Sequence, residues 1–166
     1  MTLDRLVQMH LKEALQLAVR LSGRTDTAEE IVQEALLRVS KSWKTFRQEA
    51  AFRTWLFRIV INVFRDWLKR RELVDSLDNL AEPPADHGSE SPESALLRKE
   101  FEEIVAERIS ALPPRQREVL ILMTYEDLSV VETAKLLGIS EANVHSTLHV
   151  ARERLRQELA PYLVEK

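Results

Sequence analysis

The chain has 166 residues, 45% of them hydrophobic and 31% charged, and a formal net charge of −3. This hydrophobic fraction supports packed cores and excludes a wholly disordered chain. The absence of cysteine excludes disulfide frameworks and thiol chemistry, and no stretch approaches the roughly 20 apolar residues of a membrane span, so we expect a cytoplasmic protein without membrane insertion.

Glycine content and the distribution of charge give the first positive expectations. The chain has three glycines, whereas strands joined by tight hairpins need glycine-bearing turns, so we predict an all-α fold. Residues 1–71 carry 14 Lys and Arg against 8 Asp and Glu, and residues 72–166 carry 10 against 19. A basic half can hold a polyanion, while an acidic half avoids one or meets a basic surface.

The first half of the chain reads as three helices. Apolar residues at three- and four-residue steps predict a helix over residues 3–21 that stops at Gly23. Asp26, followed by a glutamate three residues later, has the pattern of an N-cap and predicts a second helix. A loop over residues 43–49 then separates it from a long helix over residues 50–72.

The long helix has two different faces. Its apolar stripe comprises Phe52, Trp55, Leu56, Ile59, Val60, Val63 and Trp67, and its basic, amide-bearing face comprises Arg53, Arg58, Asn62, Arg65, Lys69, Arg70 and Arg71. Basic residues neutralise phosphates and aromatic rings hold unstacked bases, so this combination suits single-stranded DNA. We interpret Phe52 and Trp55 as core, and Trp43 and Phe46, in the loop, as base contacts.

The composition changes abruptly after the long helix. Residues 73–94 contain acidic residues and three prolines but no Lys or Arg. Self-repulsion and proline extend such a segment, so we predict a flexible acidic linker. It joins two small helical domains, residues 1–72 and residues 95–166.

The second domain has the signals of a helix-turn-helix. Helices are predicted over residues 95–110, 115–124, 130–137 and 141–159. Pro114 stands where a first-turn proline is tolerated, and Ser129 and Ser140 are N-cap residues. Gly138 turns the chain between the last two helices. A short helix, a glycine turn and a longer helix thus follow one another, which is the order of elements in a helix-turn-helix.

A helix-turn-helix places the start of its second helix in the major groove of DNA. The apolar positions where the two helices must touch are Val131, Ala134, Leu137, Ile139, Val144 and Leu148, and the candidate outward side chains are Glu141, Ala142, Asn143, His145, Ser146 and His149. The alternative interpretation is a helical hairpin that binds no nucleic acid.

The spacing of His145 and His149, with Glu141 one turn earlier, resembles that of zinc ligands. However, Ser146 replaces the glutamate of the H-E-x-x-H protease motif, so we predict no metal and interpret both histidines as DNA-facing or solvated. The chain also lacks a nucleophile elbow, a P-loop and a dinucleotide fingerprint. We therefore predict no cofactor and no enzymatic activity.

Taken together, the two halves resemble the extracytoplasmic-function group of the sigma-70 family over nearly the whole chain. The polymerase-clamp-binding segment of that family resembles AEEIVQEALLRVSKSW, residues 28–43, and its promoter-melting and −10-reading segment resembles FRQEAAFRTWLFRIVINVFRDWLKRR, residues 46–71. The −35-reading domain resembles LPPRQREVLIL, residues 112–122, together with the helix-turn-helix. The resemblance implies a region 2 domain, a region 4 domain and a sigma factor that directs promoter-specific transcription initiation.

The resemblance also implies partners and roles for individual residues. The partners are promoter DNA, an anti-sigma factor, and the clamp and flap of core RNA polymerase, with the acidic linker threading toward the RNA exit channel. The implied polymerase contacts are Glu30, Gln33 and Glu34. At the −10 element, the implied contacts to a flipped base are Phe46, Arg47 and Asn62, and those to the DNA backbone are Arg53, Arg65, Lys69, Arg70 and Arg71. The implied contacts to the −35 element are Glu141, Asn143, His145, Ser146, His149 and Arg152.

The sequence departs from the family pattern in the base-capturing loop and in the recognition helix. Gln48 stands where the family usually has glycine, and His145, Thr147 and Val150 stand where it usually has basic residues. Each missing charge is a lost phosphate or base contact, so −35 binding should be weak, salt-sensitive or dependent on polymerase. Two alternatives are a sigma-like decoy that binds an anti-sigma factor without driving transcription, and a conventional helix-turn-helix regulator.

Overall fold

The computed structural model describes residues 1–46, 51–78 and 93–163, and these residues form helices and no strand. The chain divides into two compact units, Met1–Pro84 and Ala85–Lys166. The prediction of an all-α protein with two small helical domains is confirmed. Among the described helices, none is both long and apolar enough to cross a membrane.

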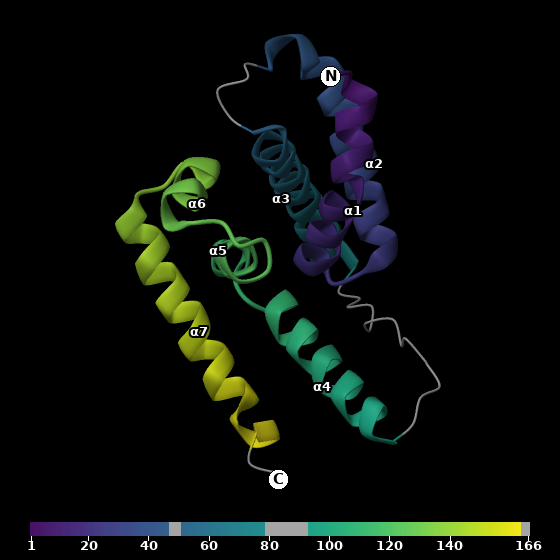
Figure 1. Ribbon diagram of the computed structural model, residues 1–166. Coiled ribbons are helices and arrows are strands. Elements are labelled where there is room, and N and C mark those ends of the chain that lie inside the picture. Colours follow the sequence, from purple (N-terminus) through teal and green to yellow (C-terminus); the bar gives the residue numbers. More distant parts are fainter. Residues whose placement is uncertain (47–50, 79–92, 164–166) are drawn as a thin grey trace. The chain divides into compact units, whose positions relative to one another are not determined.

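The first unit is a three-helix bundle. Its elements are α1 (Leu3–Ser22), α2 (Thr25–Ser42), the 3-10 helix η1 (Trp43–Thr45) and α3 (Phe52–Asp78). Each α-helix packs against the other two, as Figure 1 shows. The buried side chains that form this core include Leu17, Leu21, Ile31, Val39, Leu56, Phe57, Val60, Ile61 and Phe64.

Helix α3 is longer than the sequence pattern predicted. We expected it to end near Glu72, but it continues to Asp78. The next helix breaker is Pro83, so no residue between these positions removes a backbone donor or clashes with the preceding turn. Residues 79–92, which hold most of the predicted acidic linker, lie outside the described residues.

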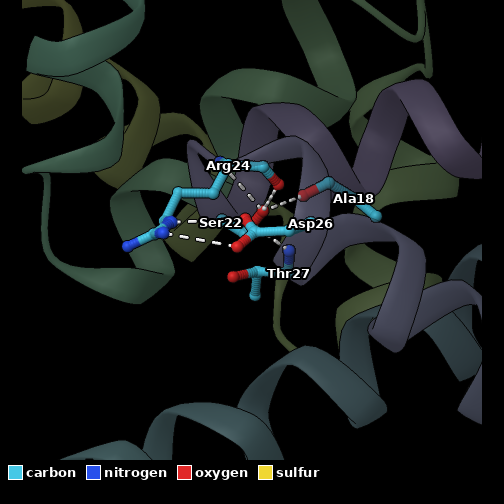
Figure 2. Close-up of polar contacts among 5 residues, drawn as sticks. All are labelled: Ala18, Ser22, Arg24, Asp26 and Thr27. Carbon is cyan, nitrogen blue, oxygen red and sulfur yellow. Dashed lines mark hydrogen bonds and ion pairs between the residues drawn. The ribbon is translucent and has the colours of Figure 1, made fainter. Parts of the chain in front are cut away.

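The turn between α1 and α2 is closed by glycine and by a serine hydroxyl. Gly23 has a φ of 76°, the left-handed conformation that glycine adopts at little cost, and its N–H donates to the Val19 carbonyl at 2.7 Å. The Ser22 hydroxyl donates to the Ala18 carbonyl at 2.7 Å and accepts from the Arg24 N–H at 3.3 Å (Figure 2). The predicted stop of the first helix is therefore confirmed.

The prediction that Asp26 caps the second helix is wrong. The helix begins at Thr25, Arg24 occupies the capping position, and Asp26 lies within the first turn. Its carboxylate accepts from the Thr27 N–H at 2.9 Å and lies 3.3 Å from the Arg24 guanidinium, as Figure 2 shows. The hydrogen bond from Thr27 and, after it, that from Arg24 lower the pKa of Asp26.

The second unit comprises α4 (Glu93–Ser110), α5 (Pro114–Thr124), α6 (Val130–Leu137) and α7 (Glu141–Leu163). Helix α7 packs against the other three, and α6 lies beside its N-terminal end (Figure 1). Four of the six expected contact residues are buried, namely Ala134, Leu137, Val144 and Leu148. Val131 is 47% exposed because it lies on the face of this eight-residue helix opposite the buried residues.

Apolar periodicity did not predict the charged residues inside this unit. Arg117, Glu118 and Glu126 are buried, each with less than a tenth of its surface exposed. One guanidinium nitrogen of Arg117 donates to the Leu112 carbonyl at 3.0 Å, and burial lowers the pKa of Arg117. The backbone carbonyl compensates part of the cost of removing this charge from water.

Two local signals fix the start and end of α6. The Ser129 hydroxyl accepts from the Glu132 N–H at 3.1 Å, and the Glu132 carboxylate accepts from the Ser129 N–H at 3.2 Å, which together form a capping box. Gly138 ends the helix with a φ of 69°. The predicted bounds of this helix and its glycine turn are confirmed.

We expect Gly138→Ala to lower the free energy of unfolding by about 1 kcal/mol, because an L-residue is strained at this positive φ. The new Cβ would meet no atom within 4 Å, so backbone strain is the whole effect. Urea denaturation of the full chain measures it. Gln157→Ala, at an exposed position of α7, is the control and should change stability by less than about 0.5 kcal/mol. Equal stability of both variants would contradict the strain argument.

Candidate functional site

The outer face of α2 presents an acidic and amide surface with one apolar residue. Glu30 and Gln33 are exposed, and Glu34 is half-buried beside them. Leu37, one turn further along, shares this face because residues three, four and seven apart lie together on a helix. Its side chain is 56% exposed, and sequence reasoning missed it although its spacing from Glu30 indicates it.

Arg38 connects this face to α3. Its Nε donates to Glu34 Oε1 at 3.3 Å, and its Nη2 donates to Asp66 Oδ2 at 2.8 Å. The hydrogen bond to Asp66 and, after it, that to Glu34 raise the pKa of Arg38. All three side chains are between a third and a half exposed, so solvent screens this network.

The basic face of α3 is centred on Asn62, which is exposed. Arg65 and Lys69 follow it at helical spacing and lie on the same side of the helix. Arg58, exposed four residues before Asn62, shares this face, and the predicted DNA contacts omitted it. Asp66 also lies here, so the acidic partner of Arg38 is part of an otherwise basic surface.

The remaining predicted contacts of this domain lie elsewhere. Arg53 and Arg71 are each nine residues from Asn62, about two and a half turns, which places them on the opposite side of α3. Arg53 forms an ion pair with Glu13 of α1 and lies 4.7 Å from the Phe57 ring. Arg71 lies 5.1 Å from the Trp67 ring. Arg70 is exposed at the edge of the basic face, and Arg47 lies outside the described residues.

Four aromatic rings lie together where η1 approaches the start of α3; we call Trp43, Phe46, Phe52 and Trp55 the aromatic cluster. Phe46 stacks on Trp43 with centroids 5.6 Å apart and lies 4.7 Å from Trp55. Phe52 is buried, as its place on the apolar stripe predicted, whereas the other three are half-buried. The rings thus form one partly accessible stacking surface, and Trp55 belongs to it as much as to the core.

In the second unit, the N-terminal half of α7 carries the predicted DNA contacts. All of them are exposed, namely Glu141, Asn143, His145, Ser146, His149 and Arg152. The Ser140 hydroxyl caps this helix by accepting from the Asn143 N–H at 3.0 Å. The Asn143 amide oxygen in turn accepts from the Thr147 hydroxyl at 2.9 Å. Within the described ranges, no three His, Asp or Glu side chains are grouped so that they could hold a metal ion.

We expect Val150→Arg to strengthen the DNA binding that the sequence predicts for this surface. Val150 is 49% exposed at the edge of this surface, so an arginine there can reach a phosphate. One added phosphate contact should steepen the slope of log affinity against log salt by about 1. Fluorescence anisotropy over a salt series measures the slope. Gln157→Arg adds the same charge about 10 Å further along the same side of α7, beyond the last predicted contact, Arg152, and an equal gain from both variants would contradict the placement.

Comparison with known proteins gives two family models that match the chain. Sigma-70 region 2 matches residues 6–73, and sigma-70 region 4 matches residues 102–155. The RNA polymerase sigma-H factor of Pseudomonas aeruginosa is 35% identical over 98% of this chain, which spans 88% of that protein. The ECF RNA polymerase sigma factor SigE of Mycolicibacterium smegmatis is 32% identical over 98% of this chain, which spans 63% of that protein.

A solved structure has the same fold. It is the sigma factor RpoE in complex with the anti-sigma factor NepR from Bartonella quintana, which superposes with a TM-score of 0.75 at 23% identity and covers 98% of each chain. At this level of identity the likeness concerns the arrangement of helices. The two units of this chain therefore have the architecture of region 2 and region 4 together.

Proposed function

The chain belongs to the sigma-70 family of RNA polymerase sigma factors, in its extracytoplasmic-function group. From this we infer which of its surfaces contact core polymerase and which contact promoter DNA during initiation. A sigma factor of this kind directs promoter-specific transcription initiation by binding core polymerase, recognising −10 and −35 elements and promoting DNA melting. We propose that it supplies no bond-breaking chemistry and acts in the cytoplasm, where polymerase works. One observation carries the proposal: each family region coincides with one compact unit.

We assign the outer face of α2 to the clamp of core polymerase. Exposed Glu30 and Gln33 supply charge and hydrogen bonds, and exposed Leu37 supplies the apolar contact that a protein interface needs at its centre. Complementary charge steers the encounter and fixes the register of the two surfaces. The second unit would dock on the polymerase flap.

We assign the basic face of α3 and the aromatic cluster to the separated non-template strand of the −10 element. Arg65 and Lys69 neutralise phosphates beside Asn62, which hydrogen-bonds a base that has left the stack. Phe46 offers a ring against which such a base can stack. Binding energy spent on the open strand shifts the melting equilibrium, so no chemistry is needed.

We assign the exposed N-terminal half of α7 to the major groove of the −35 element. His145, Ser146 and His149 lie at helical spacing along one side of α7, and Arg152 continues that side. The helix starts with the Ser140 cap, so its backbone donors and outward side chains are oriented before DNA arrives.

A second candidate function is that of a decoy that binds an anti-sigma factor without driving transcription. The observation that favours it is the exposed Val150 beside Thr147, at two positions where the family usually carries basic residues. The exposed Asn62 and Lys69 favour the sigma factor itself, because a decoy has no use for a basic face on α3. An anti-sigma factor is a proposed partner in either case.

Run-off transcription with bacterial core polymerase on a library of promoter fragments at low salt distinguishes these functions. Specific transcripts that require the protein would establish the sigma factor and reveal its promoter. Binding to core without a transcript would favour the decoy. Absence of core binding would contradict the assignment of the α2 face.

A further inference from the structure

Arg38 joins the surface assigned to polymerase with the helix assigned to promoter DNA. Through one planar group it contacts Glu34 on its own helix at 3.3 Å and Asp66 on α3 at 2.8 Å. We propose that Arg38 is a positioning residue for polymerase binding, which holds the Glu34 carboxylate in the orientation that core polymerase recognises. This inference rests on the assignment of the α2 face to polymerase.

Asp66 gives the arrangement a fixed anchor. Helices α2 and α3 pack against each other through buried residues such as Val39 and Phe64, so the distance between Arg38 and Asp66 is set by the core. The shorter of the two contacts is the one to Asp66, and it crosses between helices. Because Asp66 on α3 holds the Arg38 guanidinium in place, the guanidinium in turn restricts the Glu34 side chain, which otherwise samples several rotamers.

The same arrangement leaves the charge of Glu34 available to a partner. Arg38 faces two carboxylates and can neutralise one, so the group of three keeps a net charge of −1 beside exposed Glu30. Ordering this carboxylate before the encounter reduces the conformational entropy that binding must remove. Lysine would not replace arginine here, because its ammonium is a point charge without the fork that reaches both carboxylates.

A double-mutant cycle on affinity for core polymerase tests the proposal. Exposed ion pairs contribute little, so we expect Arg38→Ala to weaken binding by about three- to fivefold and Asp66→Asn by about twofold. In a Glu34→Ala background, neither substitution should weaken binding further, because the residue that they position is gone. Arg38→Lys should restore less than half of the loss.

The matched control is Arg24→Ala, which removes another arginine with an aspartate partner, at the start of α2. It should leave core affinity unchanged, and thermal unfolding of each variant checks that the bundle is intact. If Arg38→Ala unfolds the unit, the cycle of Asp66→Asn with Glu34→Ala takes its place.

An effect of Arg38→Ala that persists undiminished in the Glu34→Ala background would overturn the proposal, since Arg38 would then contact polymerase itself or act through the fold. Unchanged affinity in Arg38→Ala would overturn it as well. Failure of the proposed function looks different: the wild-type chain would not bind core polymerase, or Glu34→Ala and Glu30→Ala together would leave binding intact.

Discussion

We expect that reversing the charges of Glu30 and Glu34 to lysine will lower the affinity for core polymerase by about a hundredfold, because like charges brought together across an interface cost several kcal/mol. Glu30 is exposed and Glu34 half-buried on the outer face of α2, so neither carries the packing of the bundle. Competition binding against a labelled sigma factor measures the affinity. The isolated interaction with single-stranded −10 DNA should remain within about twofold of wild type.

The control for this double reversal is Asp4→Lys with Glu100→Lys, which changes the net charge equally at exposed positions of α1 and α4 that are not among the predicted contacts. Its effect on core affinity should be small, because neither residue lies on the outer face of α2 and salt screens exposed charges. Comparable losses in the two double variants would mean that net charge, and not the Glu30 and Glu34 surface, governs binding.

We expect the opposite pattern for alanine at Phe46 and Asn62: open-complex formation should fall by about tenfold or more, while the affinity for core polymerase should change little. Stacking of one base on an aromatic ring is worth about 1–3 kcal/mol, and the lost hydrogen bond from Asn62 adds to it. Permanganate footprinting of melted thymines, run beside the core-binding measurement, separates the two steps.

Asn62→Ala by itself provides the cleaner comparison. Its side chain is exposed, whereas Phe46 is half-buried and its removal also takes a partner from Trp43 and Trp55. Thermal unfolding shows whether the Phe46 variant keeps its bundle. A premelted promoter bubble should restore much of the activity of Asn62→Ala if melting is the impaired step, and equal losses on closed and premelted templates would place Asn62 outside strand capture.

Helix ends were predictable where a residue has one clear local use. Ser129 and Gly138 stand at the start and end of α6, as predicted, because a capping box and a left-handed turn each demand particular residues. Asp26 was wrongly predicted as a cap because aspartate is also favourable inside the first turn, where the helix dipole attracts it. Local sequence does not distinguish these two uses.

The surfaces were predictable to the extent that they follow helical period. His145 and His149 were predicted to face outward, and both are exposed. The prediction succeeds because the opposite side of α7 buries its apolar residues in the core. The pairing of Arg53 with Glu13 had no sequence signal, since forty residues separate them and only tertiary packing brings them together. The same holds for Arg38 and Asp66, which lie 28 residues apart.

The aromatic cluster also contains two tryptophans, whose intrinsic fluorescence can report on this site. Trp43 and Trp55 both lie within it, each in contact with the Phe46 ring. The third tryptophan of the chain, Trp67, lies more than three turns beyond Trp55 along α3, against Phe64 and beneath Arg71. A base that stacks on the cluster should therefore change the emission of the first two indoles and leave that of the third as a constant background, so intrinsic fluorescence can test the proposed strand capture without a dye.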